Sequence, residues 1–226
     1  PYSHNAQLRG LRLYWNYLRY LLFKNGPLAS TYDITAFVRS NAALTRPDAQ
    51  LTFWSLSWDR SAKGLLLEQA PGLLIMGYPL RTESEGSVRL RSADPEAPPI
   101  LRTSFLESDY DRRVIVGMFR LMRKFTEEPG LRDLIDAETL PGDSVQTDEQ
   151  IIEACRQDDT CMHAIGTCRM GQNAAAVVDA DLRVHGAIGL RVVDCSVMPT
   201  QVSGNTNGPV MALAWRAAER ILATKQ

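Results

Sequence analysis

The spacing of apolar residues predicts three helices within the first 160 residues of the chain. Apolar side chains recur every three or four positions over 6–24 and over 108–127, which is the period of an amphipathic helix. Thr147 and Gln150 have the Thr-x-x-Gln spacing of a capping box, which predicts that a shorter helix follows over 148–157.

Strand patterns lie between the first two helices. Polar and apolar residues alternate over 50–58, which is the period of a half-exposed strand, and further strand candidates cover 72–80 and 87–92. The stretch 93–99 contains three prolines and is expected to be irregular, because proline has no N–H group to donate to a sheet. We therefore expect an α+β fold, in which the strands form one antiparallel sheet and helices cover it.

The last seventy residues have a different character. Residues 162–170 contain one histidine, followed by a Gly-Thr pair, and 189–194 form a short apolar strand candidate that ends in a carboxylate. A polar turn over 203–209 leads directly into a helix over 210–222. A polar turn at a helix N-terminus offers free N–H groups to an anionic or electron-rich ligand, so this region is predicted to form a binding site.

Composition narrows the class of protein. The 226 residues are 45% hydrophobic and 23% charged, which is typical of a globular protein. Because 25 Lys and Arg balance 26 Asp and Glu, the chain lacks the basic excess that nucleic-acid binding or an anionic membrane surface favours. Apolar runs are too short to span a bilayer. The four cysteines form no CxxC pair, which favours a reducing, cytoplasmic location.

A cluster of Cys155, Cys161, His163 and Cys168 raises the question of a zinc site. Five, one and four residues separate them, which matches no common zinc pattern, so we predict buried thiols and no metal. Pattern alone leaves His163 equally open to a catalytic and a structural role. The chain has no P-loop, Gly-x-Gly-x-x-Gly or nucleophile-elbow motif, so nothing in it argues for a dinucleotide pyrophosphate site.

Residues 162–171, Met-His-Ala-Ile-Gly-Thr-Cys-Arg-Met-Gly, resemble the His-x-x-Gly-Thr-Cys-x-Met-Gly segment of the glucose–methanol–choline (GMC) oxidoreductases. Segments 177–194, 196–200 and 203–207 follow in the family's order, and 86–95 also looks similar to the family. The resemblance covers nearly the whole chain, and its C-terminal half is highly specific.

The resemblance implies a division into two parts. Residues 1–160 would form a substrate-binding domain, and 161–226 would be the C-terminal strand and helix that complete a Rossmann-like FAD-binding domain. The family's Gly-rich fingerprint is missing from this chain, so we expect FAD to bind only together with an N-terminal FAD-binding half, present as a separate chain or fragment. We expect a small alcohol as the substrate, and neither nucleic acid nor a membrane span.

The resemblance also implies the chemistry. GMC enzymes oxidise an alcohol to an aldehyde or ketone by hydride transfer to flavin N5, so a base must take the hydroxyl proton. His163 matches the family's base, and Asn205 matches the position that donates to the developing alkoxide. Asparagine at that position resembles the choline-oxidising branch.

Four further residues match family positions that approach the flavin. These cofactor-binding candidates are Asp194, Cys195, Thr206 and Asn207. Without the resemblance, structural roles are favoured: Asp194 would cap the end of a strand, and Thr206 and Asn207 would be ordinary residues of a helix N-terminus.

Two alternatives stay open at this point. Some relatives with the same fold are flavin-containing lyases or photodecarboxylases, in which an alcohol does not reduce the flavin. A non-catalytic binding fragment is the other alternative, because the FAD-binding half is missing from this chain.

Overall fold

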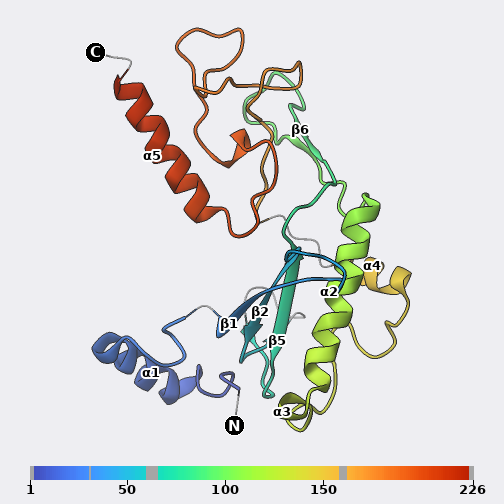
Figure 1. The fold of residues 1–226 in the computed structure, drawn as a ribbon. Coiled ribbons are helices and arrows are strands. Elements are labelled where there is room, and N and C mark those ends of the chain that lie inside the picture. Colours follow the sequence, from blue (N-terminus) through green and yellow to red (C-terminus); the bar gives the residue numbers. More distant parts are fainter. Residues whose placement is uncertain (1–2, 31, 60–65, 158–161, 224–226) are drawn as a thin grey trace. The chain divides into compact units, whose positions relative to one another are not determined.

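The structure is a computed structural model that describes residues 3–30, 32–59, 66–157 and 162–223 (Figure 1). Two compact units are present: unit 1 comprises residues 1–78 and 118–132, and unit 2 comprises 79–117 and 133–226. No helix in the described ranges is both long and apolar enough to span a membrane.

Unit 1 is built on a three-stranded sheet. Its strands are β1 (Ile34–Val38), β2 (Ala49–Trp54) and β5 (Leu74–Pro79), in the order β1-β2-β5. Strands β1 and β2 are antiparallel, and Ala36 lies opposite Leu51. The first three residues of β2 are buried, so the middle strand forms the core of the sheet.

Helix α2 (Asp109–Glu127) packs its second half against this sheet (Figure 1). The ring of Phe125 meets the ring of Phe53 edge-on, with centroids 5.9 Å apart. Gly77 of β5 allows the close approach, because a Cβ there would lie 2.6 Å from the Met118 sulfur and 2.7 Å from a Leu51 methyl carbon. Both of these side chains are fully buried, so neither has room to move aside.

The segment before helix α1 (Gly10–Phe23) is fixed by a buried amide. The Asn5 side chain donates to the Ser57 hydroxyl at 3.0 Å and to the carbonyls of Glu68 and Ala70 at 3.1 and 2.8 Å. These bonds hold the N-terminal segment against the two-stranded sheet of β3 (Trp58–Asp59) and β4 (Leu66–Leu67).

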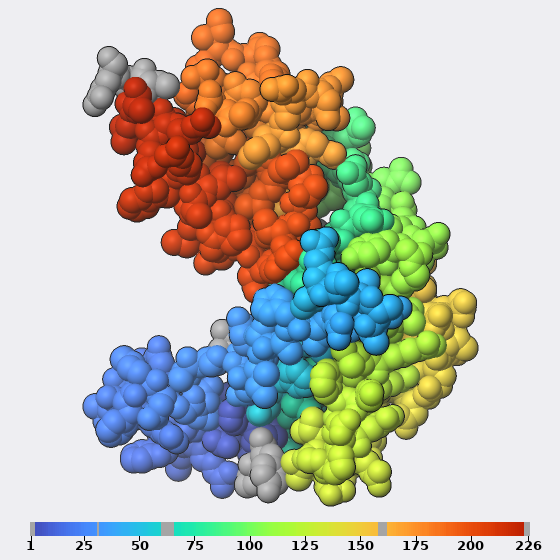
Figure 2. Space-filling view, viewed as in Figure 1, coloured from blue at the N-terminus to red at the C-terminus, as the bar shows by residue number. Residues whose placement is uncertain are grey.

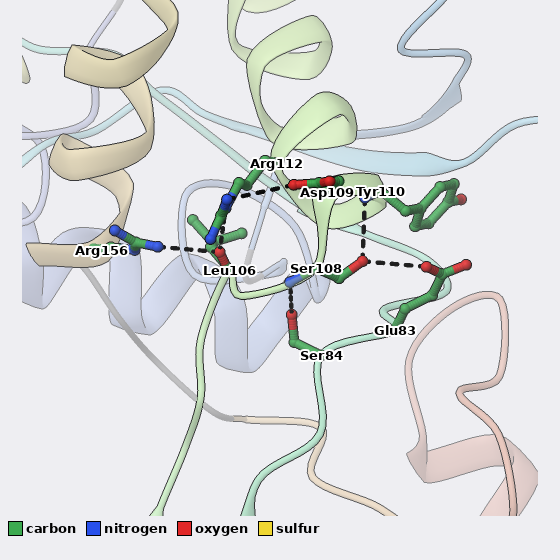
Figure 3. Close-up of polar contacts among 8 residues, drawn as sticks. All are labelled: Glu83, Ser84, Leu106, Ser108, Asp109, Tyr110, Arg112 and Arg156. Atoms are coloured by element: carbon green, nitrogen blue, oxygen red, sulfur yellow. Dashed lines mark hydrogen bonds and ion pairs between the residues drawn. The ribbon is translucent and has the colours of Figure 1, made fainter.

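In unit 2, the start of α2 holds the loop before strand β6 (Ser87–Arg89). The buried Asp111 carboxylate accepts hydrogen bonds from the backbone N–H groups of Glu83 and Ser84, at 2.9 and 2.8 Å. The Ser84 hydroxyl in turn accepts from the Ser108 N–H at 2.9 Å (Figure 3). The loop and the start of the helix are therefore joined by hydrogen bonds. Strand β6 continues from this loop and pairs with β7 (Ile100–Arg102).

Helix α4 (Asp148–Gln157) confirms the predicted capping box. The Gln150 N–H donates to the Thr147 hydroxyl at 3.3 Å, and the Gln150 side chain accepts from the Thr147 N–H at 3.0 Å. Arg156 of the same helix donates to the Leu106 carbonyl, which also accepts from Arg112 (Figure 3). Helix α4 is thereby attached to the segment that precedes α2.

Two expectations about strands were wrong. The strand expected over 50–58 is divided, because β2 ends at Trp54 and Trp58 pairs with Leu67 instead, so the described residues form three small sheets in place of the single sheet. Residues 189–194 form no strand and contribute one isolated bridge, Arg183 to Arg191. The mixed helical and antiparallel architecture itself is confirmed.

The remaining helices are α3 (Pro129–Arg132), the 3₁₀ helix η1 (Cys195–Val197) and α5 (Asn207–Ala223). Helix α5 begins three residues earlier than the sequence predicted. The predicted domain boundary at 160/161 lies outside the described residues and stays a prediction.

The substitution Gly77→Ala should destabilise the protein by about 1–3 kcal/mol, because the added methyl group overpacks a filled core. Urea unfolding of the two proteins measures the difference. Gly130→Ala is the matched control, because no atom lies within 4 Å of a Cβ at that position. Equal stability of the two variants would show that Gly77 does not set the spacing between helix and sheet.

Candidate active site

The predicted site region is organised by two segments that lie side by side in unit 2. The Cys168 N–H donates to the Ser196 carbonyl, and the Met170 N–H donates to the Val197 carbonyl, both at 2.9 Å. Gly166 starts this stretch with a φ of +82°, and a Cβ there would lie 3.5 Å from the Met198 carbonyl oxygen. Glycine adopts this φ without strain, so the chain can turn and run along the second segment.

A small apolar core lies beneath this pair of segments. Val178, Leu182 and Val197 are buried together with Ala217 of α5, and Met170 packs against them. Helix α5 is therefore anchored to the same core as the two paired segments.

The paired segments 168–170 and 196–197, together with the core beneath them, form the framework of the site. The two proposed catalytic residues flank this framework. His163 is half-buried and lies three residues before the Gly166 turn. Asn205 is exposed in the turn that precedes α5. Both belong to unit 2, and the segments that carry them are connected through the shared core.

Polar contacts attach the segment 81–86 to two parts of the site region, namely the turn before α5 and the segment that follows Gly166. The Arg81 guanidinium donates to the Ser203 hydroxyl at 2.7 Å, two residues before Asn205. The guanidinium nitrogens of Arg169 lie 3.3 Å from the carboxylate oxygens of Glu85. The exposed ion pair of Arg169 and Glu85 contributes little to stability. Sequence reasoning missed these residues, since partners 84 and 122 positions apart leave no local pattern.

Asp194 and Cys195 lie where the chain enters η1. The Asp194 carboxylate accepts from the Ser196 N–H at 2.7 Å and so caps this helix. Cys195 is a half-buried free thiol at its first position. Asp194 therefore caps a 3₁₀ helix, and not the end of a strand as the sequence alone suggested, because residues 189–194 form no strand.

Thr206 and Asn207 lie at the N-terminus of α5. The Thr206 carbonyl accepts from the Val210 N–H at 2.9 Å, which closes the first turn of the helix. Asn207 is the first helical residue, and the first turn of α5, all of which the structure describes, contains no carboxylate. The positive end of this helix thus carries two polar side chains and no competing negative charge.

The other histidine and cysteine candidates have structural positions. The His185 Nε2 atom lies 3.1 Å from the Gly171 carbonyl oxygen, which fixes the ring in its turn. Burial raises the pKa of the Cys155 thiol, so this side chain stays neutral. Within the described part of the chain, no three His, Cys, Asp or Glu side chains are grouped to hold a metal; Cys161 lies outside it.

Comparison with known proteins places this region in a family. The family profile described as GMC oxidoreductase matches residues 82–214, which include both halves of the framework. The chain belongs to the GMC oxidoreductase family.

Individual relatives agree with this assignment. An oxygen-dependent choline dehydrogenase of Brucella ovis is 35% identical over 209 residues, which cover 91% of this chain and 38% of that protein. An FAD-dependent oxidoreductase from Chaetomium thermophilum is 27% identical with a TM-score of 0.66, over 80% of this chain and 29% of that one. Formate oxidase of Aspergillus oryzae matches the fold with a TM-score of 0.84 at 23% identity, over 98% of this chain and 44% of that chain. The chain spans about two fifths of the length of the curated relatives it matches.

The substitution Asp194→Ala should lower the free energy of unfolding by about 1 kcal/mol, because it removes the acceptor for the Ser196 N–H. Thermal unfolding of the purified protein measures the loss. Asp136→Ala is the control, since the exposed Asp136 carboxylate makes no hydrogen bond within the described residues. If both variants melted at the wild-type temperature, the cap would contribute nothing to the stability of the framework.

Proposed function

We propose that this chain supplies the catalytic residues of an FAD-dependent oxidoreductase that oxidises an alcohol to an aldehyde or ketone. The observation that carries the proposal is the shared framework: the His163 and Asn205 segments join one small core, inside the region that matches the family. The likeness to a choline dehydrogenase supports an alcohol as the substrate.

His163 is proposed to take the proton of the substrate hydroxyl group. A base that accepts this proton lowers the free-energy barrier to expelling a hydride from the carbon that bears the hydroxyl group. The half-buried position of His163 suits this role, because part of the residue is accessible to a small substrate.

Asn205 is proposed to donate its side-chain amide to the oxygen that becomes negatively charged. An amide donor stabilises that charge without itself gaining or losing a proton. The Arg81 bond to Ser203 supports this role, because it fixes the turn two residues before Asn205.

We propose that the N-terminus of α5 would face the electron-rich edge of a flavin. Thr206 and Asn207 provide a hydroxyl and an amide, and the free N–H groups of the first turn add the positive end of the helix dipole. When bound, FAD supplies the acceptor for the hydride. We propose that Asp194 and Cys195 help to hold FAD through the position of the η1 segment. The Asp194 carboxylate itself already accepts a hydrogen bond from the Ser196 N–H.

The surface of the chain supports completion of the site by further protein. The chain exposes 15,726 Å² of accessible surface, whereas two separate compact bodies of the sizes of unit 1 and unit 2 would expose about 12,400 Å² together. Helix α5 exposes Met211, Trp215 and Leu222, which the helical period places along one side. We propose that the part of the protein corresponding to the rest of its relatives, which would carry most of the FAD site, covers this side.

The substitution His163→Ala in the complete, FAD-loaded protein should lower the turnover of alcohols about 10²–10⁴-fold, because the proton loses its acceptor. Visible absorbance should show that the bound flavin is retained. His185→Ala is the matched control, since that ring contacts the Gly171 carbonyl and should affect turnover only a few-fold. Full turnover in the His163 variant would refute the assignment of the base.

The substitution Asn205→Ala should also lower turnover, by about 10–10³-fold, because the developing alkoxide loses a hydrogen bond.

The reaction class is measured in the same samples, by adding alcohol without oxygen and following the flavin absorbance. Bleaching of the wild-type flavin is expected. A flavin that stays oxidised with every class of alcohol tested would contradict alcohol oxidation and favour a lyase or decarboxylase.

A further inference from the structure

Arg81 connects the loop before β6 to the turn that carries Asn205. Its guanidinium donates to the Ser203 hydroxyl at 2.7 Å, across 122 positions of sequence. Both residues belong to unit 2, so the contact forms within one compact unit. Figure 2 shows the blue-green residues of the β6 region beside the orange residues of the C-terminal stretch. A hydrogen bond with a charged donor is stronger than one between neutral groups, so this contact is suited to hold a turn in place.

The turn around Asn205 is not part of a regular element. Residues 199–206 lie between η1 and α5 and belong to no helix or strand. The Gly204 N–H donates to the Val202 carbonyl at 2.8 Å, which is a local bond that does not attach the turn to the rest of unit 2. Asn205 itself is exposed. The direction of its side chain therefore depends on contacts that reach the turn from other segments.

The backbone around Arg81 is held on both sides. Leu80, which precedes it, is only 2% exposed. Two residues after it, the N–H groups of Glu83 and Ser84 donate to the buried Asp111 carboxylate at 2.9 and 2.8 Å. A buried carboxylate keeps such donors firmly, because losing one leaves a buried polar group without its hydrogen bond. The Arg81 side chain therefore extends from a backbone whose position is fixed.

The far end of the same loop is also held closely. A Cβ at Gly86 would lie 2.1 Å from the Arg102 carbonyl oxygen, so only glycine allows the two backbones to come this near. The Ser108 hydroxyl donates to the Glu83 carboxylate at 3.1 Å, and this bond adds to the attachment of the loop at the start of α2 (Figure 3). The loop is therefore fixed at both of its ends.

We propose that Arg81 is a positioning residue, which directs the Asn205 amide toward the reacting oxygen by holding Ser203. This inference rests on the proposed function, since Asn205 is there assigned to the developing alkoxide. Arg81 acts through the turn and touches neither substrate nor flavin in this role. A displacement of about 1 Å can lower the rate of a reaction about 10²-fold. A contact two residues from the donor is therefore close enough to control turnover.

The contact fits positioning better than a contribution to stability. Ser203 is exposed and Arg81 is half-buried, so water replaces either partner when the bond is lost. Substitutions at such sites change the free energy of unfolding little. The same loss separates the turn from the fixed loop. Turnover should therefore respond to the bond while the melting temperature does not.

The test measures the turnover of alcohols by the complete, FAD-loaded protein. Arg81→Met and Ser203→Ala should each lower kcat about tenfold and change KM less than about twofold, because the amide acts on the transition state. The double substitution should lower kcat no further than either single one, since both remove the same bond. Ser203→Ala removes a single exposed hydroxyl group, so it decides the question even if Arg81→Met folds poorly.

Arg91→Met and Ser92→Ala are the matched controls. The Arg91 Nε atom donates to the Pro98 carbonyl at 3.2 Å, and the Ser92 hydroxyl accepts from the Asp94 N–H at 3.3 Å. Both side chains are exposed in unit 2, and these contacts connect residues of one loop. Neither contact reaches the site, so kcat should stay at the wild-type value.

The Asn205→Ala protein separates positioning from other roles of the guanidinium. When residue 205 is already alanine, Arg81→Met should cause no further loss of kcat, because there is no amide left to direct. A further loss in that protein would overturn the proposal. So would a loss with Arg81→Met that Ser203→Ala does not reproduce, because the guanidinium would then act by another route.

Hydrogen–deuterium exchange of residues 203–206 tests the contact without turnover. Arg81→Met should speed exchange in this turn severalfold and leave exchange in α2 unchanged. Unchanged exchange, together with full turnover of the Arg81 and Ser203 variants, would overturn this inference while an impaired Asn205→Ala protein still supported the proposed function. Full turnover of Asn205→Ala itself would instead refute the role of Asn205 in the proposed function, and the positioning role with it.

Discussion

The pairing of residues 168–170 with 196–197 is the constraint on which the candidate site depends. Two backbone hydrogen bonds of 2.9 Å and the buried Val197 side chain hold these segments together. His163 precedes one segment and Asn205 follows the other, so the pairing connects the two stretches of chain that carry these residues. Few regular elements contribute here, since most of the stretch between α4 and α5 consists of turns and isolated bridges. Backbone hydrogen bonds therefore define the positions that helices and strands define in other sites.

A second constraint connects the site to unit 2 as a whole. The buried Asp111 carboxylate fixes the Glu83–Ser84 loop to the start of α2, and the same loop region carries Arg81 and Glu85. Arg81 contacts Ser203 and Glu85 contacts Arg169. A buried carboxylate with two backbone donors is strongly favoured in one geometry, because losing either bond leaves a buried polar group unpaired. The exposed contacts at 81–86 thus start from a rigid base.

How much the sequence predicts depends on how local the signal is. The capping box of Thr147 and Gln150 was predicted correctly, since its donors and acceptors lie within four residues of one another. The helix expected over 108–127 was also correct to within one residue, because a strong apolar period repeats over several turns. The strand expected over 50–58 was wrong, since alternation cannot show that Trp58 pairs with Leu67 and leaves the sheet of β2. For the same reason, no pattern predicted the contact between Arg81 and Ser203.

By itself, the sequence determined the family, the mixed helical and antiparallel class, and the residues proposed for catalysis, because each of these is encoded in short motifs or local periods. Only the tertiary structure decided which segments lie side by side, that apolar residues of α1 such as Leu11 and Phe23 are exposed in this chain, and that Asp194 caps η1. An apolar stripe has the same sequence pattern whether it is buried or exposed. Its environment is set by the packing of distant residues, and so it is decided only when the chain has folded.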